Sequence, residues 1–386
     1  MKILHVVPTY FPATRYGGPI YSVHGLCAGL VRDDNEVHVF TTNVDGDRES
    51  KVPLETEVDL DGVKICYFPS IRLRRLYYSP RMLDSLRDKI QEFDMVHLHS
   101  IFLWPTWAAA RVAREAGVPY VLSPRGMLVP DLIRRKNRWI KSAWLRLIEK
   151  KNIEYAAAIH VTSDTEESDL RGFPYAFPPV ITIANGIGDP IGWVFDDLTS
   201  DVAEVVKGEP YVLCFGRINW KKGLDRLLCA WSEVPGIRLV IAGNDEDGYV
   251  AALREIAHEV DVSDRVCFLD RAISGADKEA LLSTARLLVL ASYSENFGNV
   301  VPEAMVRGVP VVVTREVGAK DIVERSAGGF VVDADDLAEK INVLLQNEDK
   351  RKAVGEQGVA WAREHLAWDL VAAQMRVAYE SICESE

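Results

Sequence analysis

Two positively charged side chains follow an apolar run of strand length in the second half of the chain. The run Tyr211–Phe215 leads into Gly216, and Arg217 and Lys222 come next, before a helix expected to begin near Gly223. Ligands of parallel α/β sheets bind at the carboxyl ends of the strands. An arginine fork and a lysine ammonium placed there can neutralise a diphosphate, including the charge that grows when a bond to it breaks. The competing interpretation, two solvated surface cations, is disfavoured by their position at a strand end.

A second segment combines two glutamates with a helix start. Residues 292–303 read SYSENFGNVVPE and follow the apolar run Leu287–Leu290. Free amides at a helix start can bind an anion, and Gly298 allows a ligand to approach the backbone closely. The carboxylates of Glu295 and Glu303 each suit a vicinal diol, so one is expected to hold the transferred sugar and the other the ribose. For Glu303 the alternative is an ordinary acid favoured by the helix dipole.

The first half of the chain offers a glycine pair and a histidine. Gly17 and Gly18 follow the apolar run Ile3–Val7 and precede a proline, which makes a preorganised helix start whose amides could meet phosphate. His97 and His99 alternate along a strand and share one face, and His99 is nearer the carboxyl end. We therefore expect His99 to contact substrate, and its alternative is a structural histidine whose hydrogen bonds are satisfied.

These residues must be positioned by alternating strands and helices. Continuous apolar strands separated by amphipathic helices indicate parallel sheets covered on both faces. The expected strands of the first half are Ile3–Val7, Val37–Thr41, Val63–Phe68, Met95–His99, Tyr120–Ser123, Ile159–Thr162 and Ile181–Ala184. The pattern restarts with Tyr211–Phe215, Arg238–Ala242, Val266–Leu269, Leu287–Leu290 and Val309–Thr314. Two series predict two Rossmann-like, doubly wound domains.

Turn-forming residues at 185–190 separate the two series. We expect an N-terminal domain over 1–188 that includes a returning helix at 367–386, and a C-terminal domain over 189–366. Basic and acidic residues number 24 and 22 in 1–188, which leaves 21 and 35 for the rest, so the net charge of -12 falls on the second half. An acidic chain of this kind is not expected to bind nucleic acid generally.

Composition predicts a cytoplasmic protein. Hydrophobic residues make up 48% of the 386 residues, yet no stretch reaches the length of a bilayer span and no signal peptide is recognisable. The six cysteines have no ligand spacing and are expected to be reduced thiols. No metal site is expected, and no cofactor.

The motifs together resemble the retaining glycosyltransferases of family 4, which have the GT-B fold. The resemblance rests on the Glu-x7-Glu spacing of Glu295 and Glu303, on Gly216-Arg217 followed after four residues by Lys222-Gly223, on the interdomain Asn185-Gly186 turn and on the Gly17-Gly18 loop. It covers nearly the whole chain. It implies two domains that face a central cleft, with the acceptor bound by the first domain and the donor mainly by the second.

The resemblance also implies roles for single residues. Arg217 and Lys222 would bind the donor diphosphate and stabilise the leaving group, with Glu295 facing the donor sugar and Glu303 the ribose. Gly17 and Gly18 would contribute from the first domain. The remaining implied donor contacts are Ile273 near the nucleobase and Asn296, Phe297, Gly298, Asn299 and Val300, with the amides of 297–300 facing the donor.

One departure from the family pattern concerns the donor sugar. Many relatives carry histidine in the segment that here reads Ser123-Pro124-Arg125-Gly126-Met127-Leu128. An arginine does not act as a base at neutral pH, but it can bind a hydroxyl, a carboxylate or a phosphate. Arg125 is therefore expected to contact the sugar or the acceptor, and the donor sugar stays open. A second departure, Asp270 where glycine is common, has no explanation in the sequence.

A basic segment at 131–152 predicts contact with an anionic membrane. Arg134, Arg135, Lys136, Arg138, Lys141, Arg146, Lys150 and Lys151 oppose only Asp131 and Glu149. Apolar residues including Trp139 and Trp144 recur at helical spacing, which is typical of an interfacial helix. The alternative is a helix that packs its apolar stripe on the core. The basic, aromatic run 71–78 in the same half favours the membrane interpretation.

The sequence as a whole predicts transfer of a sugar from a nucleotide-diphosphate sugar to a hydroxyl acceptor with retention of configuration. UDP or GDP is the expected nucleotide, and a lipid-linked or cell-surface glycan precursor is the expected acceptor. Two alternatives stay open: another GT-B enzyme, such as a nucleotide-sugar epimerase, and a non-catalytic subunit that binds nucleotide sugar.

Overall fold

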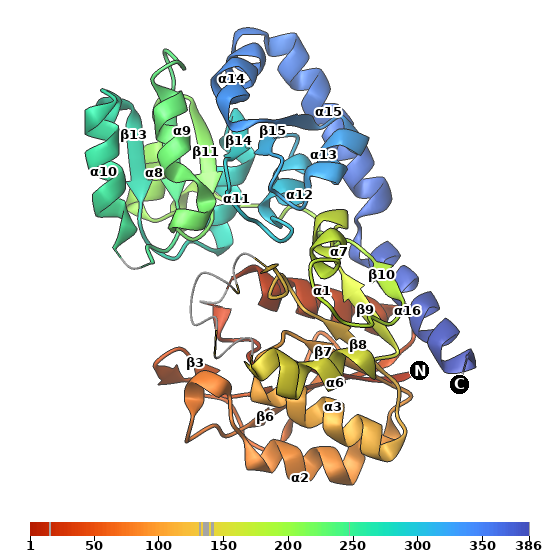
Figure 1. Ribbon diagram of the computed structural model, residues 1–386. Coiled ribbons are helices and arrows are strands. Elements are labelled where there is room, and N and C mark those ends of the chain that lie inside the picture. Colours follow the sequence, from red (N-terminus) through yellow and green to blue (C-terminus); the bar gives the residue numbers. More distant parts are fainter. Residues whose placement is uncertain (15–16, 131–132, 134–138, 140–142, 247, 386) are drawn as a thin grey trace. The chain divides into compact units, whose positions relative to one another are not determined.

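The computed structural model describes residues 1–14, 17–130, 133, 139, 143–246 and 248–385 (Figure 1). The chain divides into two compact units, Met1–Gly186 together with Trp368–Glu386, and Ile187–Ala367. The boundary expected after residue 188 lies close to this division.

The first unit is built on a sheet whose strand order, among the described residues, is β10-β9-β8-β7-β1-β2-β6-β5. The bounds are β1 Lys2–Val6, β2 Glu36–Thr42, β5 Glu57–Leu60, β6 Val63–Phe68, β7 Met95–His99, β8 Tyr120–Ser123, β9 Ala158–Val161 and β10 Val180–Thr182, with a separate hairpin of β3 Val44–Asp45 and β4 Arg48–Glu49. All neighbours pair in parallel except β5, which runs antiparallel to β6.

The antiparallel edge corrects the expectation of a purely parallel sheet. Asp61 and Gly62 connect β5 to β6, and both have positive φ angles, 53° and 80°. An Asp-Gly pair with two positive φ angles is typical of a tight hairpin turn. The dipeptide and its flanking alternation, Val58-Asp59-Leu60, were the signal for this strand in the sequence.

Helices cover both faces of the first sheet. They are α1 Gly18–Arg32, α2 Pro80–Lys89, α3 Trp104–Ala116, α6 Lys150–Glu154, α7 Asp164–Leu170 and α16 Trp368–Glu384. Proline occupies the first turn of α1, α2 and α3, where its missing N–H costs no helix hydrogen bond. The residues of β1 alternate between two cores, since Ile3 belongs to one and Leu4 to the other.

The C-terminal helix α16 belongs to the first unit and packs against α1 (Figure 1). Two glycines of α1 make this close packing possible. A Cβ atom on Gly25 would lie 2.2 Å from the Trp368 ring, and one on Gly29 would lie 2.8 Å from the Ala372 side chain. The returning helix expected from residue 367 onward is therefore built into the core of the first unit.

The second unit has a parallel sheet of order β13-β12-β11-β14-β15-β16 within the described residues. Its strands are β11 Tyr211–Phe215, β12 Arg238–Ala242, β13 Val266–Leu269, β14 Leu287–Leu290, β15 Val311–Thr314 and β16 Gly329–Val332. Its helices are α8 Ser200–Lys207, α9 Leu224–Trp231, α10 Tyr249–Glu259, α11 Gly275–Thr284, α12 Val300–Met305, α13 Lys320–Ser326, α14 Leu337–Gln346 and α15 Glu348–His365. The strand order reverses beside β11, and that switch point is where such sheets bind ligands.

No helix in the part of the chain that the structure describes is long and apolar enough to cross a bilayer.

Candidate active site

The loop after β11 is shaped by two glycines. Gly216 has φ 143°, and Gly223, which precedes α9, has φ 58°. A Cβ atom on Gly223 would lie 1.9 Å from the carbonyl oxygen of Ala291, so only glycine fits between this loop and the end of β14. The 3-10 turn Trp220–Lys222 between the glycines carries the predicted lysine.

Lys222 forms an ion pair with Glu295, and both side chains are largely buried. These two residues come from the loops after β11 and β14, neighbouring strands of the sheet. The structure thus brings together two residues that the sequence placed 73 positions apart. A lysine ammonium and a carboxylate side by side at strand ends supply one group for phosphate and one for sugar hydroxyls.

Arg217 is directed to a partner that the sequence did not suggest. Its Nη1 atom lies 2.6 Å from Oε1 of Glu246, and Asn219 Nδ2 donates to the other oxygen of the same carboxylate at 2.9 Å. The Arg217 side chain remains 57% exposed, so this pair is worth little and can exchange for a ligand. Glu246 lies in the acidic run after β12, which gave no signal of a site.

The loop 292–299 is held by a neighbouring loop. The backbone N–H of Glu295 donates to Glu316 at 3.1 Å, and its carbonyl accepts from Gly318 at 2.9 Å. Gly298 has φ 87°, and a Cβ atom there would lie 3.3 Å from the Glu295 side chain. The loop conformation therefore depends on this glycine and on the segment after β15.

The side chains of Phe297 and Val300 are buried, so these residues can offer a donor only their backbone groups. Asn296 and Asn299 lie in the same loop, between the end of β14 and the start of α12. Ile273 is half-buried in the connection from β13 to α11. Contacts of these residues with a donor remain predictions.

Glu303 lies on α12 and pairs with Lys278 of α11 at 2.8 Å, with both side chains 25% exposed. The Lys278 ammonium also lies 5.8 Å from the ring of Phe215 at the end of β11. Lys278 is thus the partner of a predicted site residue, and the sequence analysis missed it. In the sequence it is one charged residue in an amphipathic helix, and only the fold brings it to Glu303.

Arg271, next to the expected nucleobase contact Ile273, has a structural role. Its guanidinium binds both oxygens of Asp201 at 2.8 Å and one oxygen of Asp277 at 2.9 Å. The hydrogen bonds from Arg271 hold the pKa of the Asp201 carboxyl well below its usual range. Arg271 therefore ties the β13–α11 connection to α8.

The Gly17-Gly18 segment begins α1 without a side-chain cap. Gly17 is the N-cap residue, with φ 73° and ψ -139°, a conformation suited to glycine. A Cβ atom there would meet nothing within 4 Å. Backbone conformation, not crowding, thus requires glycine at this helix start, and its contact with phosphate stays a prediction.

A buried polar row crosses the first sheet on the face that α1 and α16 cover. Tyr379 of α16 lies 2.6 Å from Nδ1 of His97, whose Nε2 lies 2.7 Å from the Ser123 hydroxyl. Ser123 in turn lies 2.8 Å from Nδ1 of His160, and Nε2 of that ring donates to the Ile183 carbonyl at 3.0 Å. Because a carbonyl only accepts, Nε2 of His160 carries a proton and Nδ1 of that ring accepts from the Ser123 hydroxyl. Ser123 therefore accepts from Nε2 of His97, and Nδ1 of His97 accepts from the Tyr379 hydroxyl.

His99 belongs to a second row with Arg125 and His5. Arg125 Nη2 donates to Nδ1 of His99 at 3.2 Å, so Nε2 of His99 carries a proton and donates to Nδ1 of His5 at 2.9 Å. His99 is 1% exposed with both ring nitrogens occupied. Its ring is therefore not offered to a ligand in this structure, and it holds Arg125 instead.

Ligand atoms of His5, His97 and His99 lie within 4.8 Å of one another, which is close enough to consider a metal. The hydrogen bonds argue against that use. Both nitrogens of His97 are taken by Tyr379 and Ser123, and the guanidinium of Arg125 beside His99 repels a cation. Burial lowers the pKa of His5 to about 3, so this ring is neutral.

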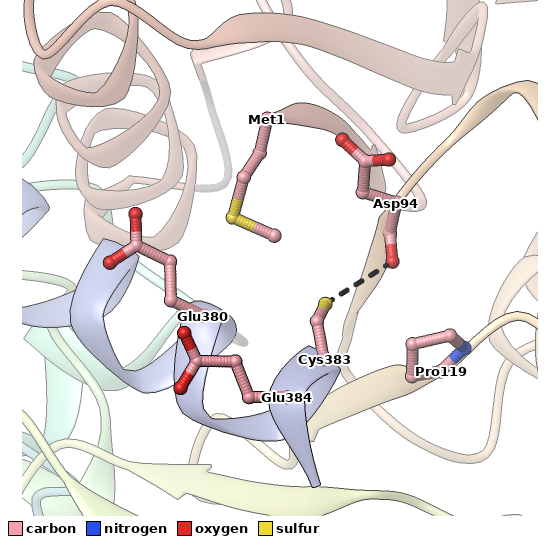
Figure 2. Close-up of a pocket in the computed structure, with 6 residues that line it drawn as sticks. All are labelled: Met1, Asp94, Pro119, Glu380, Cys383 and Glu384. Atoms are coloured by element: carbon pink, nitrogen blue, oxygen red, sulfur yellow. Dashed lines mark hydrogen bonds between the residues drawn. The ribbon is translucent and has the colours of Figure 1, made fainter. Parts of the chain in front are cut away.

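A shallow hollow of about 390 Å³ lies away from the residues above (Figure 2). Its lining is Met1, Asp94, Pro119, Glu380, Cys383 and Glu384. Figure 2 shows the Cys383 thiol directed at the Asp94 carbonyl, 3.6 Å away. The hollow adjoins the amino ends of strands, whereas ligands of such sheets bind at the carboxyl ends.

The basic segment is only partly within the described residues: Asp131, Arg134, Arg135, Lys136, Arg138, Ile140 and Lys141 lie outside them. Within the expected apolar stripe, Trp139 and Leu147 are 76% and 74% exposed, whereas Trp144 and Ile148 are half-buried.

Glu149 corrects the expected charge balance of that segment. It is fully buried, and its carboxylate accepts from the Phe102 N–H at 2.8 Å and from the Trp144 indole at 2.9 Å. Burial raises the pKa of Glu149. This acid therefore does not offset the exposed cations Arg146, Lys150 and Lys151 at the surface.

Comparison with known proteins separates the chain into the same two parts. Residues 17–186 match the glycosyl transferase 4-like domain, and residues 197–361 match the glycosyl transferases group 1 family. An uncharacterised glycosyltransferase of Methanocaldococcus jannaschii is 26% identical, over 100% of this chain and 99% of the relative. A D-inositol 3-phosphate glycosyltransferase of Mycobacterium marinum is 28% identical over 71% of this chain and 60% of its own length.

The fold has solved counterparts. HepE of Anabaena, crystallised with UDP and glucose, has a TM-score of 0.74 at 21% identity and covers 99% of this chain and 100% of its own. The two matched domains account for both units and contain every residue of the predicted site. The chain belongs to the family-4 type of glycosyltransferases, with a glycosyl transferase 4-like first domain and a group 1 second domain.

Proposed function

We propose that this glycosyltransferase moves a hexosyl group from a nucleotide-diphosphate sugar to a hydroxyl acceptor, with retention of configuration and with the donor held by the second unit. The observation that carries the proposal is the Lys222–Glu295 ion pair at the switch point of the second sheet. A diphosphate would take Lys222 and Arg217 from their carboxylates. Glu295 would then be free to accept hydrogen bonds from sugar hydroxyls.

Glu303 completes the donor site in this proposal. Its carboxylate suits the ribose diol, and Lys278 at 2.8 Å orients it before nucleotide binds. HepE, which shares the fold, was crystallised with UDP and glucose, and this supports a UDP-sugar as the first donor to try. The chain's own cations and amides neutralise the diphosphate in this proposal, so no metal is required.

Donor screening followed by product analysis tests this function. UDP-, GDP- and ADP-sugars at equal concentration should raise the unfolding temperature in the order of their affinities. Nucleoside diphosphate should be released only when acceptor is present, whereas an epimerase would interconvert donor sugars without acceptor. An NMR spectrum of the product should show the anomeric configuration of the donor. Inverted configuration would contradict the retaining mechanism, and donor binding without turnover would favour a non-catalytic subunit.

We further propose a cytoplasmic location with peripheral contact to an anionic membrane, which suits a lipid-linked glycan acceptor. The supporting observation is the exposure of Trp139 and Leu147 in the basic segment, and of Ile71 and Leu73, at 79% and 65%, in the basic run 71–78. Exposed apolar side chains among cations are typical of interfacial binding. Each Lys or Arg near an anionic surface adds about 1 kcal/mol within a Debye length.

Vesicle co-sedimentation tests the membrane contact. The protein should sediment with anionic vesicles at low salt, and little with neutral ones. Replacing Trp139 and Leu147 by serine, or Arg134, Arg135, Lys136 and Arg138 by glutamine, should release it while donor binding is unchanged. Wild-type protein that ignores anionic vesicles at low salt would contradict both the membrane contact and the main support for a lipid-linked acceptor.

A further inference from the structure

The guanidinium of Arg125 has fewer acceptors than its donors require. Arg125 follows β8, with φ 55°, and Gly126 follows with φ 71°. Nη1 donates to Oδ1 of Asn185 at 3.0 Å and Nη2 to Nδ1 of His99 at 3.2 Å. The Nε atom is buried and has no hydrogen-bond partner among the described residues. A guanidinium carries more N–H donors than these two contacts use.

Both acceptors of Arg125 are uncharged. Burial, and after it the charge of Arg125, lowers the pKa of His99 well below its usual value. The same two causes lower the pKa of His5 and of His160 to about 3. The imidazoles around Arg125 are therefore neutral at physiological pH, and the arginine is the charged member of the cluster.

No described carboxylate lies within 4.0 Å of the Arg125 nitrogens. The charge of Glu166 acts on Arg125 from a greater distance, since the oxygens of that carboxylate are bonded elsewhere. One oxygen accepts from the Gly126 N–H at 2.7 Å, and the other accepts from the N–H and hydroxyl of Thr162 at 2.9 and 3.0 Å. Glu166 thus offsets part of the charge but takes none of the donors of Arg125.

Arg125 lies where a ligand of the first sheet is expected. It follows the carboxyl end of β8, and His99 ends the neighbouring strand β7. Asn185 and His99 hold the guanidinium from two sides, so its orientation is fixed before a ligand binds. A fixed, half-buried arginine with unused donors matches the planar, bidentate geometry of a carboxylate or phosphate.

We propose that Arg125 binds an anionic group of the substrate, a carboxylate or a phosphate carried by the transferred sugar or by the acceptor. The inference rests on the proposed glycosyl transfer and narrows its substrate class to acidic sugars or phosphorylated acceptors. Asn185 and His99 are positioning residues in this site. A neutral sugar would leave the guanidinium charge without an opposite charge within ion-pair distance, which costs free energy.

Matched donor pairs test the first source of the anion. Calorimetric titration of the full chain should compare UDP-glucuronate with UDP-glucose, UDP-galacturonate with UDP-galactose, and GDP-mannuronate with GDP-mannose. If the transferred sugar carries the anion, one acidic donor should bind at least about tenfold more tightly than its neutral counterpart. The preference should fall to about twofold or less in Arg125→Met and be partly kept in Arg125→Lys.

An acceptor arm tests the second source. With nucleoside diphosphate present at saturation, calorimetric titration compares the affinities of glucose and mannose with those of their 6-phosphates and of glucuronate. An Arg125-dependent preference for the anionic member in this arm places the anion on the acceptor. Equal affinities within every pair in both arms, or a preference that Arg125→Met retains, would overturn the inference.

Two controls separate this outcome from other failures. Arg171→Gln removes an equal charge from the same unit, at a side chain that is 78% exposed, and should leave every preference unchanged. Thermal unfolding establishes that the Arg125 variants are folded. If wild-type protein binds no nucleotide and no nucleotide sugar, the proposed function is contradicted. If it binds nucleotide but shows no Arg125-dependent preference for anionic ligands, only the anion site is contradicted.

Discussion

At the scale of single residues, the proposed donor site consists of cations already paired with carboxylates. Lys222 pairs with Glu295, Arg217 with Glu246, and Glu303 with Lys278. Such pairs satisfy the charges of the side chains, and a diphosphate sugar offers each partner a replacement. Binding would therefore exchange ion pairs rather than bury new, unpaired charges, whose desolvation is costly.

Lys222→Ala should lower the turnover number at least about tenfold, because one lost charge contact in a closed site exceeds about 1.4 kcal/mol. Steady-state kinetics at saturating donor measure the effect. Lys221→Ala, which removes the same charge from the adjacent position of the 3-10 turn, is the matched control and should change turnover far less. Unchanged kinetics in a folded Lys222→Ala variant would refute the assignment.

Glu303→Ala should weaken nucleoside diphosphate binding by roughly 1.5–3 kcal/mol if this carboxylate holds the ribose. Calorimetric titration with the nucleotide alone measures it. Lys278→Met removes the partner but leaves the carboxylate, so its loss of affinity should be smaller. Equal affinities for wild-type and Glu303→Ala protein would show that Glu303 only stabilises the α11–α12 packing.

At the scale of secondary-structure elements, the contact between α1 and α16 decides whether the chain's end joins the first unit. Glycines in a helix interior are unfavourable by about 1 kcal/mol relative to alanine. Gly25 and Gly29 are nevertheless required, since side chains there would overlap Trp368 and Ala372. Close packing of α16 outweighs the helix propensity of α1.

Gly25→Ala should therefore destabilise the protein despite the better helix former. Overpacking costs about 1–3 kcal/mol, against a gain of up to about 1 kcal/mol from helix propensity. Urea unfolding measures the net change. Adding Trp368→Leu should recover part of the loss, because the smaller side chain makes room for the methyl group. If Gly25→Ala alone makes the protein more stable than wild type, α16 is not packed as described.

At the scale of the whole molecule, the buried histidines couple stability to pH. His5, His97, His99 and His160 are all at most 3% exposed. Burial lowers the pKa of each, to about 3 for His5 and His160, and the charge of Arg125 is the next cause for His5, His99 and His160. In the unfolded chain these rings have pKa values of about 6.5.

The free energy of unfolding should therefore fall as the pH falls from 7.5 to 5.5. In this window the unfolded histidines take up protons and the buried ones do not, so acid favours unfolding. Each buried histidine contributes about 1.4 kcal/mol of loss by pH 5.5. Chemical denaturation at both pH values measures the free energy of unfolding. His97→Gln should reduce its loss between the two pH values by the contribution of one histidine, about 1.4 kcal/mol. A pH-independent unfolding free energy, or an undiminished loss in the variant, would contradict this.

The sequence by itself determined the two α/β series, the positions of twelve of the sixteen described strands and the residues of the proposed donor loops. These features depend on local patterns: apolar runs of strand length, glycines where the backbone needs a positive φ, and charges just after strand ends. Lys222 and Glu295 could be named in advance because each follows an apolar strand, and ligands of such sheets bind at the carboxyl ends of the strands.

Only the tertiary structure decided which groups pair. Lys278 reaches Glu303 and Glu246 reaches Arg217 because separate helices and loops pack side by side, and no spacing in the sequence records that contact. The burial of Glu149 likewise depends on Phe102, which lies 47 positions away along the chain. The neutral histidines around Arg125 follow from burial, which sets their pKa values and is a property of the packed sheet, not of any local segment.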